Sequence, residues 1–148
     1  MQNKREEDRE AKKSKLQILK TLMATRGANL CADHINALNL IDFEFYKVEE
    51  VRKAWKEYLA HLNPTETQNS TQWATKRLDL LTCLIVKIAA HLNYHYEHVD
   101  LKSNCYLPSR WTSAEEDLEI IRQGLRAWVE KKSALPLQVE LINDSEAV

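Results

Sequence analysis

The chain has 148 residues, of which 44% are hydrophobic and 29% are charged, and its formal net charge is −1. This length allows one domain with a substantial core, and this composition is that of a globular protein and excludes a disordered one. With only 2 glycines and 3 prolines, the chain lacks Gly-rich phosphate-binding loops, and helices are favoured over hairpins. The near-zero net charge argues against a nucleic-acid-binding protein.

The first 26 residues form a predicted helix over residues 4–26, ended by Gly27. Residues 4–15 are polar on every side, so this part is expected to project into solvent as a basic extension over residues 1–15. Residues 1–26 carry eight Lys or Arg side chains against four acids. From Leu16 onward apolar residues recur at helical spacing. This stripe is a candidate association face between two copies of the chain, formed by Leu16, Leu19 and Met23.

Three further helices follow in the middle of the chain. Apolar residues at intervals of three and four predict helices over residues 32–45 and 48–62, the second ending where Asn63 precedes Pro64. The next helix runs from Trp73 to Leu92 and is the most apolar, which predicts that it forms the centre of a bundle. Its longest apolar stretch, residues 80–92, contains Lys87 and is too short to span a bilayer.

The last part of the chain combines an irregular stretch, a helix and a tail. Residues 93–111 are rich in Tyr, His and Asn. A capping box from Thr112 to Glu115 predicts a helix over residues 112–132, and residues 137–142 alternate like an extended arm within an acidic tail, 137–148. The predicted fold is therefore all-α: a compact bundle of about five helices over residues 16–136, with a projecting first helix and an extended C-terminal arm.

Histidines at the end of the fourth helix are candidate metal ligands. His91 and His95 are one helical turn apart, and zinc sites use such pairs with a third ligand, here His98. Asn93 is expected to end the helix between them, however. The alternative is that these imidazoles lie at a helix C-terminus, where cationic side chains interact well with the helix dipole.

The stretch after these histidines concentrates polar side chains on a predicted surface loop. Loops held by a rigid scaffold often carry function. The candidate polar site consists of Asp100, Lys102, Asn104 and Tyr106. A loop fixed by its own side chains is the alternative, because no nucleophile, base and orienting group occur at a catalytic spacing.

Asp42 is a separate candidate, placed on what the pattern predicts to be a packed helix face. An ionised carboxylate there needs a partner, and Arg52 and Arg77 on neighbouring helices are the expected ones. A structural ion pair is the first interpretation, and a general base is the second.

Several segments resemble an uncharacterised bacterial family of unknown function. The resemblance runs over most of residues 16–136 and is carried by residues 19–26 (LKTLMATR), 37–42 (ALNLID), 51–55 (VRKAW) and 99–108 (VDLKSNCYLP). Members of that family often have a transmembrane helix and a basic linker before the helical domain. The resemblance therefore implies either a soluble member of that family or a membrane tether through a segment that these 148 residues do not contain. It also makes the matched polar residues, Asp42, Asp100, Lys102 and Tyr106, candidates for a shared site.

Three functional hypotheses follow, of which nucleic-acid binding through the basic first helix is disfavoured by the acids in that same helix. The first is a non-enzymatic protein-interaction or scaffold domain that self-associates through its first helix and binds a protein partner, with no cofactor. The second is a small metal-dependent enzyme or hydrolase that uses residues 91–110, with zinc as the expected metal. Three widely spaced cysteines without a CxxC pair, Cys31, Cys83 and Cys105, and no signal peptide favour the cytoplasm, where thiols stay reduced.

Overall fold

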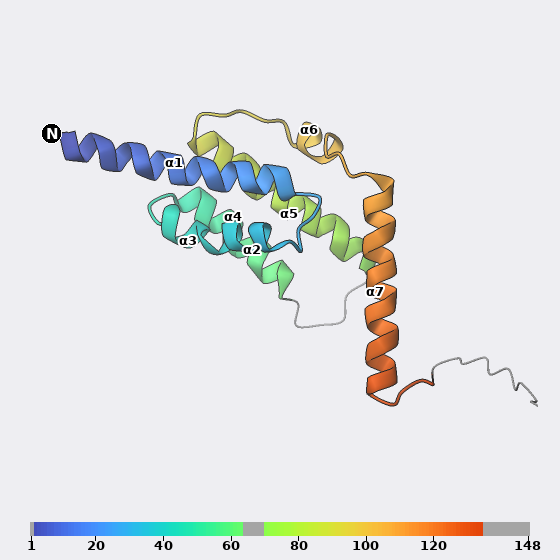
Figure 1. Cartoon of the computed structure of the whole chain (residues 1–148). Helices are drawn as coiled ribbons and strands as arrows, with labels where there is room; N and C mark the ends of the chain where they lie inside the picture. The colour runs from blue at the N-terminus through green and yellow to red at the C-terminus, as the bar shows by residue number, and fades with distance from the viewer. Residues whose placement is uncertain (1, 64–69, 135–148) are drawn as a thin grey trace, which may run out of the picture. The chain divides into compact units, whose positions relative to one another are not determined.

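A computed structural model describes residues 2–63 and 70–134 of the chain (Figure 1). Within these ranges the chain is all-helical and contains no strand, which confirms the predicted fold class. The helices are α1 (Gln2–Thr25), α2 (Ala32–Asn39), α3 (Ile41–Glu44), α4 (Glu49–Leu62), α5 (Ser70–His91), α6 (His98–Ser103) and α7 (Ser109–Val129). The chain divides into two compact units, Met1–Tyr106 and Leu107–Val148, and each is described by itself.

The core of the first unit forms where α1 and α4 pack against α5. In Figure 1 the C-terminal half of α1 runs beside α5, and α1 also packs against α2 and α3. The predicted central position of the most apolar helix is confirmed, because α5 contacts α1, α4 and α6. The fully or almost fully buried side chains include Ile18, Leu19 and Leu22 of α1, Val51, Trp55 and Tyr58 of α4, and Leu81, Leu84, Ile85 and Ile88 of α5.

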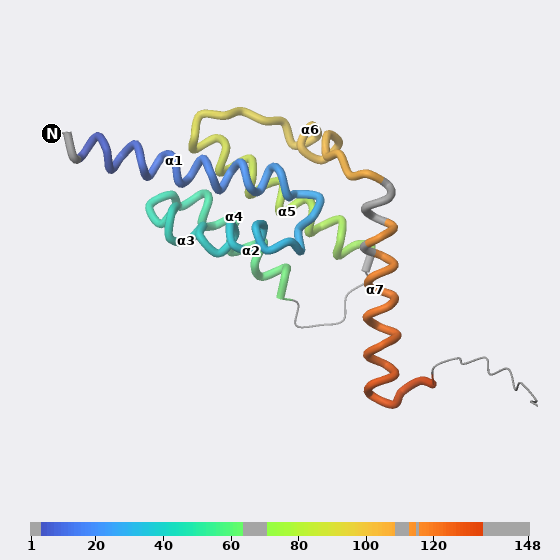
Figure 2. Tube along the Cα trace, in the orientation of Figure 1, coloured from blue at the N-terminus to red at the C-terminus, as the bar shows by residue number. Residues whose placement is uncertain are grey.

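The beginning of α1 lies outside this packing. Residues 4–13 are exposed, as predicted, and the tube in Figure 2 shows this part of the helix extending beyond α3 and α5. Contact with the unit begins at Ser14, whose hydroxyl donates a hydrogen bond to Glu44 Oε1 over 2.6 Å. From Ile18 onward the apolar side of the helix is buried.

Two short helices correct the predicted elements of this unit. The predicted helix 32–45 is broken at Leu40, between α2 and α3, and the next residue, Ile41, is completely buried. The break therefore lies directly before a core residue. The predicted irregular stretch 93–111 contains α6, whose residue Leu101 is 4% exposed. One buried leucine therefore holds a short helix where the polar sequence predicted none.

The second unit contains α7, which begins earlier than predicted. The helix starts at Ser109 after Pro108, so Thr112 lies inside the helix and the capping box predicted there is wrong. Proline fits such a boundary because its missing N–H is not needed there and its φ, here −59°, is fixed. The predicted extended arm, residues 137–142, lies outside the described residues.

The C-terminus of α7 is closed by a Schellman motif. Lys131 adopts a left-handed conformation (φ 56°), its N–H donates to Trp128 O over 3.0 Å, and the N–H of Lys132 donates to Ala127 O over 2.8 Å. These bonds satisfy the last carbonyl groups of the helix. None of the helices described in either unit is long and apolar enough to cross a membrane.

Candidate functional site

The stretch predicted to carry a polar site is fixed to the first unit by Arg26, directly after α1. Its Nε donates to Leu101 O over 3.2 Å and its Nη2 donates to Asn104 O over 2.9 Å, while Nη1 contacts Met23 O. The guanidinium thus joins the C-terminal carbonyls of α1 and α6. A positive charge suits both positions because a helix C-terminus carries unpaired carbonyls and a partial negative charge.

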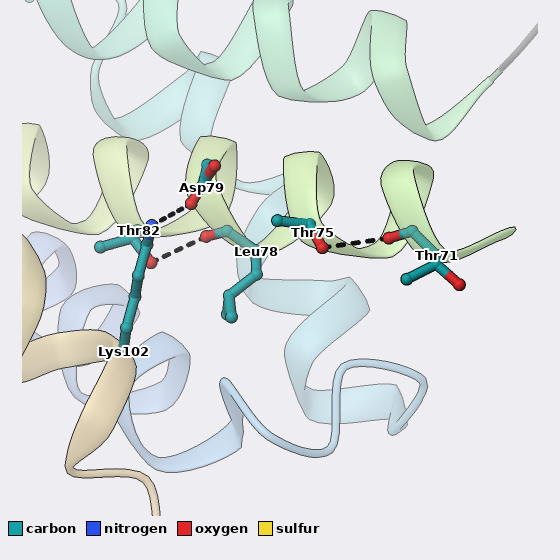
Figure 3. Close-up of polar contacts among 6 residues, drawn as sticks. All are labelled: Thr71, Thr75, Leu78, Asp79, Thr82 and Lys102. Carbon is teal, nitrogen blue, oxygen red and sulfur yellow. Dashed lines mark hydrogen bonds and ion pairs between the residues drawn. The ribbon is translucent and has the colours of Figure 1, made fainter. Parts of the chain in front are cut away.

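A second attachment joins α6 to α5. Lys102 of α6 forms an ion pair with Asp79 of α5, as Figure 3 shows. Both side chains are partly exposed, so the pair alone adds little stability. Its consequence for function is that the ammonium group of Lys102 already has a carboxylate partner.

The hydroxyl groups near this ion pair bond to their own helix. Thr82, which is buried, donates to Leu78 O over 2.7 Å, and Thr75 donates to Thr71 O over 3.0 Å (Figure 3). Such bonds to the carbonyl four residues earlier are a usual way to satisfy a threonine inside a helix. The hydroxyl groups of Thr82 and Thr75 are therefore satisfied within α5.

The remaining residues of the predicted polar site lie in or next to α6. Tyr106 is 85% exposed, and Asp100 is exposed on α6. Asn104 ends α6 and serves through its main-chain oxygen, which Arg26 binds. These positions share a surface segment, and the contacts of Lys102 and Asn104 support the structural interpretation of that segment.

Asp42 lies in a different part of the first unit. It belongs to α3, which packs against α1, α2 and α4. Its Oδ2 accepts a hydrogen bond from Trp55 Nε1 over 3.2 Å, and its Oδ1 lies 3.7 Å from Arg52 Nε. The predicted pairing with Arg52 is confirmed. The predicted packed position is wrong, because the Asp42 side chain is 56% exposed.

The three histidines considered as metal ligands are separated by the end of α5. Asn93 adopts a left-handed conformation (φ 67°), and the N–H of Tyr94 donates to Ala89 O over 2.9 Å in a second Schellman motif. This turn takes His95 off the helix that carries His91. Across the described residues, no group of three or more His, Cys, Asp or Glu side chains is placed to hold a metal ion. His91 instead meets the ring of Phe45 edge-on, with the ring centroids 5.8 Å apart.

A buried histidine that the sequence did not single out lies between α1 and α2. His34 is 1% exposed, and its Nδ1 is 2.8 Å from Thr25 Oγ1. The Thr25 hydroxyl gives its proton to Thr21 O over 2.7 Å, so Nδ1 must carry a proton and donate it to Thr25. The other ring nitrogen, Nε2, is buried and has no hydrogen-bond partner in the described part of the chain. Burial lowers the pKa of His34, and the charge of Arg77 lowers it further.

The predicted association face on α1 is occupied by the chain itself. Leu19 is 4% exposed within the core, and Leu16 and Met23 are half-buried and pack against that core. A second copy could reach Leu19 only if the first unit opened. The stripe on α1 is therefore not a free surface.

A hollow on the surface of α4 offers no obvious chemistry. Both basic and acidic side chains line it, and they include Lys47, Glu49, Arg52, Lys53, Lys56 and Glu57. Two carboxylates among four cations leave a modest positive charge and no acid–base pair that the structure isolates from water. We assign no site to it.

The exposed apolar surface of the second unit is a stronger candidate. Four large side chains of α7 recur at intervals of three and four residues and are 44–56% exposed. We call this surface the α7 stripe; it consists of Leu118, Ile121, Leu125 and Trp128. In the sequence these residues recur at helical spacing, and that spacing alone gave no sign that they stay exposed.

The comparisons with known proteins identify a family. The sequence model of a family described as a family of unknown function (DUF6680) matches residues 1–147. The chain belongs to this family. Searches with the sequence of the chain found no match among the curated proteins and none among the solved structures. The match covers both units, so α7 is as much a part of the DUF6680 sequence as the core helices are. The transmembrane helix and the bacterial origin implied by the resemblance stay predictions.

The role of Arg26 can be tested with Arg26→Lys. Lysine keeps the positive charge but cannot donate to several carbonyls in the fixed geometry of a guanidinium. We expect a loss of about 1–3 kcal/mol in the free energy of unfolding and increased motion of amides 98–104 in NMR relaxation measurements. Arg5→Lys, in the exposed part of α1, is the matched control. Unchanged relaxation over residues 98–104 would contradict this role.

His34 predicts a pH dependence of stability. Because its pKa is lower in the folded chain than the ordinary value of 6.5, the unfolded chain binds a proton more readily below pH 6.5. The free energy of unfolding is therefore not reduced by His34 above pH 6.5. It falls as the pH drops from 6.5 through the lower pKa that His34 has in the folded chain. Urea unfolding between pH 7.5 and 5 should show a steeper loss for the natural chain than for His34→Asn, whose amide still donates to Thr25. Parallel curves would refute the assignment.

Proposed function

We propose that this chain is a non-enzymatic protein-interaction domain whose α7 stripe binds an amphipathic helix of a protein partner. The observation that carries the proposal is the exposure of Leu118, Ile121, Leu125 and Trp128 on one side of a single helix. Contiguous apolar surfaces of this kind on a folded chain mark interaction sites.

The spacing of the stripe indicates the kind of partner. Intervals of three, four and three residues between positions 118 and 128 follow the a and d positions of a heptad repeat. A second helix packs its own apolar side chains between such positions, whereas a flat surface would leave gaps. Helix-on-helix binding is therefore the recognition mode that fits α7.

In the first unit, candidate catalytic side chains are bound by other residues, which favours the association role over the enzyme hypothesis. Apolar side chains of α1, α4 and α5 fill its core, and two of the five candidate polar side chains, Lys102 and Asp42, are bound to Asp79 and to Trp55 and Arg52. The histidines of the 91–98 stretch do not converge with other ligands among the described residues. Among residues 2–63 and 70–134, these contacts give the enzyme hypothesis no arrangement of side chains in its favour.

We place the domain in the cytoplasm as part of the same proposal. Its three cysteines, Cys31, Cys83 and Cys105, are half-buried and unpaired. Unpaired thiols suit a reducing compartment. The membrane tether expected from the resemblance stays a prediction.

A photo-reactive amino acid placed at position 121 or at position 120 tests the proposal in cells that produce the chain. Ile121 lies in the stripe, whereas Ile120 is 67% exposed on another side of the same helix. We expect covalent adducts with a helical protein segment from position 121 and few from position 120. Equal yields at the two positions, or none at 121, would contradict a role for the stripe.

A further inference from the structure

We propose that the helix bound by the α7 stripe is α7 of a second copy of this chain, aligned parallel and in register. This inference rests on the proposed function and goes further by identifying the partner. It follows from the positions of the charged residues beside the stripe.

In a heptad assignment, Leu118 and Leu125 occupy a positions, and Ile121 and Trp128 occupy d positions. Asp117 then lies at g and Arg122 at e, five residues later. In a parallel pair of helices, the g residue of one helix faces the e residue of the next heptad on the other. Asp117 of each copy would therefore face Arg122 of the other, which gives two ion pairs by symmetry.

The charge of Arg122 disfavours an antiparallel pair. That arrangement brings e positions of the two helices together, so Arg122 would lie close to Arg122 of the second copy. Within one chain Arg122 Nη1 is 3.5 Å from Glu119 Oε2, and both side chains are more than half exposed. An exposed pair of this kind is weak, so Arg122 is able to turn toward a second copy.

The chain's own tail fits the stripe less well than a second α7 does. Residues 135–148 contain apolar residues, but their charged residues are all acidic: Glu140, Asp144 and Glu146. Such a segment would match Arg122 and repel Asp117. A second copy of α7 provides a partner for both charges as well as four apolar side chains.

The polar side of α7 is suited to solvent while the stripe is covered. Gln123 Nε2 donates to Glu119 Oε1 over 2.9 Å, and Arg126 Nε donates to Glu130 Oε1 over 2.9 Å. These pairs, four residues apart, support the helix without using the stripe. The stripe spans only residues 118–128, so we expect a reversible dimer whose population rises with concentration.

Sedimentation velocity of the full chain over a range of concentrations tests this proposal. The natural chain should shift from monomer to dimer. Ile121→Asp should weaken dimerisation by roughly 100-fold or more, because it buries an unpaired charge. Ile120→Asp is the matched control, with the same substitution one residue away on an exposed side, and should dimerise like the natural chain.

Charge variants test the orientation. Asp117→Arg and Arg122→Asp should each weaken dimerisation by roughly tenfold, since each places like charges opposite each other in a parallel pair. An equimolar mixture of the two variants should recover dimerisation, because both facing pairs are again opposite in sign. An unaffected Asp117→Arg variant would overturn the parallel arrangement.

Each of the other possible outcomes also identifies or rejects a partner for the stripe. A chain that stays monomeric at every concentration would overturn the second-copy proposal, and dimerisation that appears only after removal of residues 135–148 would assign the stripe to the tail. Dimerisation equally weakened by Ile120→Asp would place the contact elsewhere. A monomeric chain that nevertheless forms adducts with a different protein at position 121 would leave the proposed function standing and reject only this inference.

Discussion

The burial of one side of α1 removes the apolar stripe of that helix from the free surface of this chain. Ile18, Leu19 and Leu22 are at most 4% exposed, in a core that α5 and α4 complete. Burying a leucine-sized side chain contributes about 1.5–3 kcal/mol, so these three contacts are too costly to exchange for contacts with a second copy. Association through α1 would have to use its exposed first half, which is polar on every side.

Contacts with the core also hold the polar segment after α5. A Schellman turn at Asn93 ends α5, Leu101 enters the core, and Arg26 and Asp79 bind the helix that carries Leu101. Each of these contacts holds in place a residue that the sequence analysis had proposed for function, or a residue close to one in the chain. The apolar stripe of α7 is different, because nothing in its own unit covers it among the described residues: its four side chains remain about half exposed.

The all-helical fold, the central position of α5 and the projecting start of α1 could be predicted because helical periodicity records which residues face a core. The same periodicity does not tell whether a stripe is buried inside its own unit or stays exposed for a partner. Leu19 on α1 and Leu125 on α7 lie in similar stripes, yet the first is 4% exposed and the second 52%. Arg26 and His34 were missed because their roles depend on partners far along the chain, such as Leu101, or on an adjacent helix, such as Thr25. No local spacing marks such contacts.

Hydrogen exchange of the intact chain, measured at concentrations well above and well below its monomer–dimer midpoint, tests the central claim most directly. Amides of a helix that packs against a second copy exchange more slowly when the dimer is populated, whereas amides of an internal core do not depend on concentration. The account predicts slower exchange at high concentration in α7 and no change in α1. Concentration-dependent slowing in α1, or the absence of any change in α7, would contradict it.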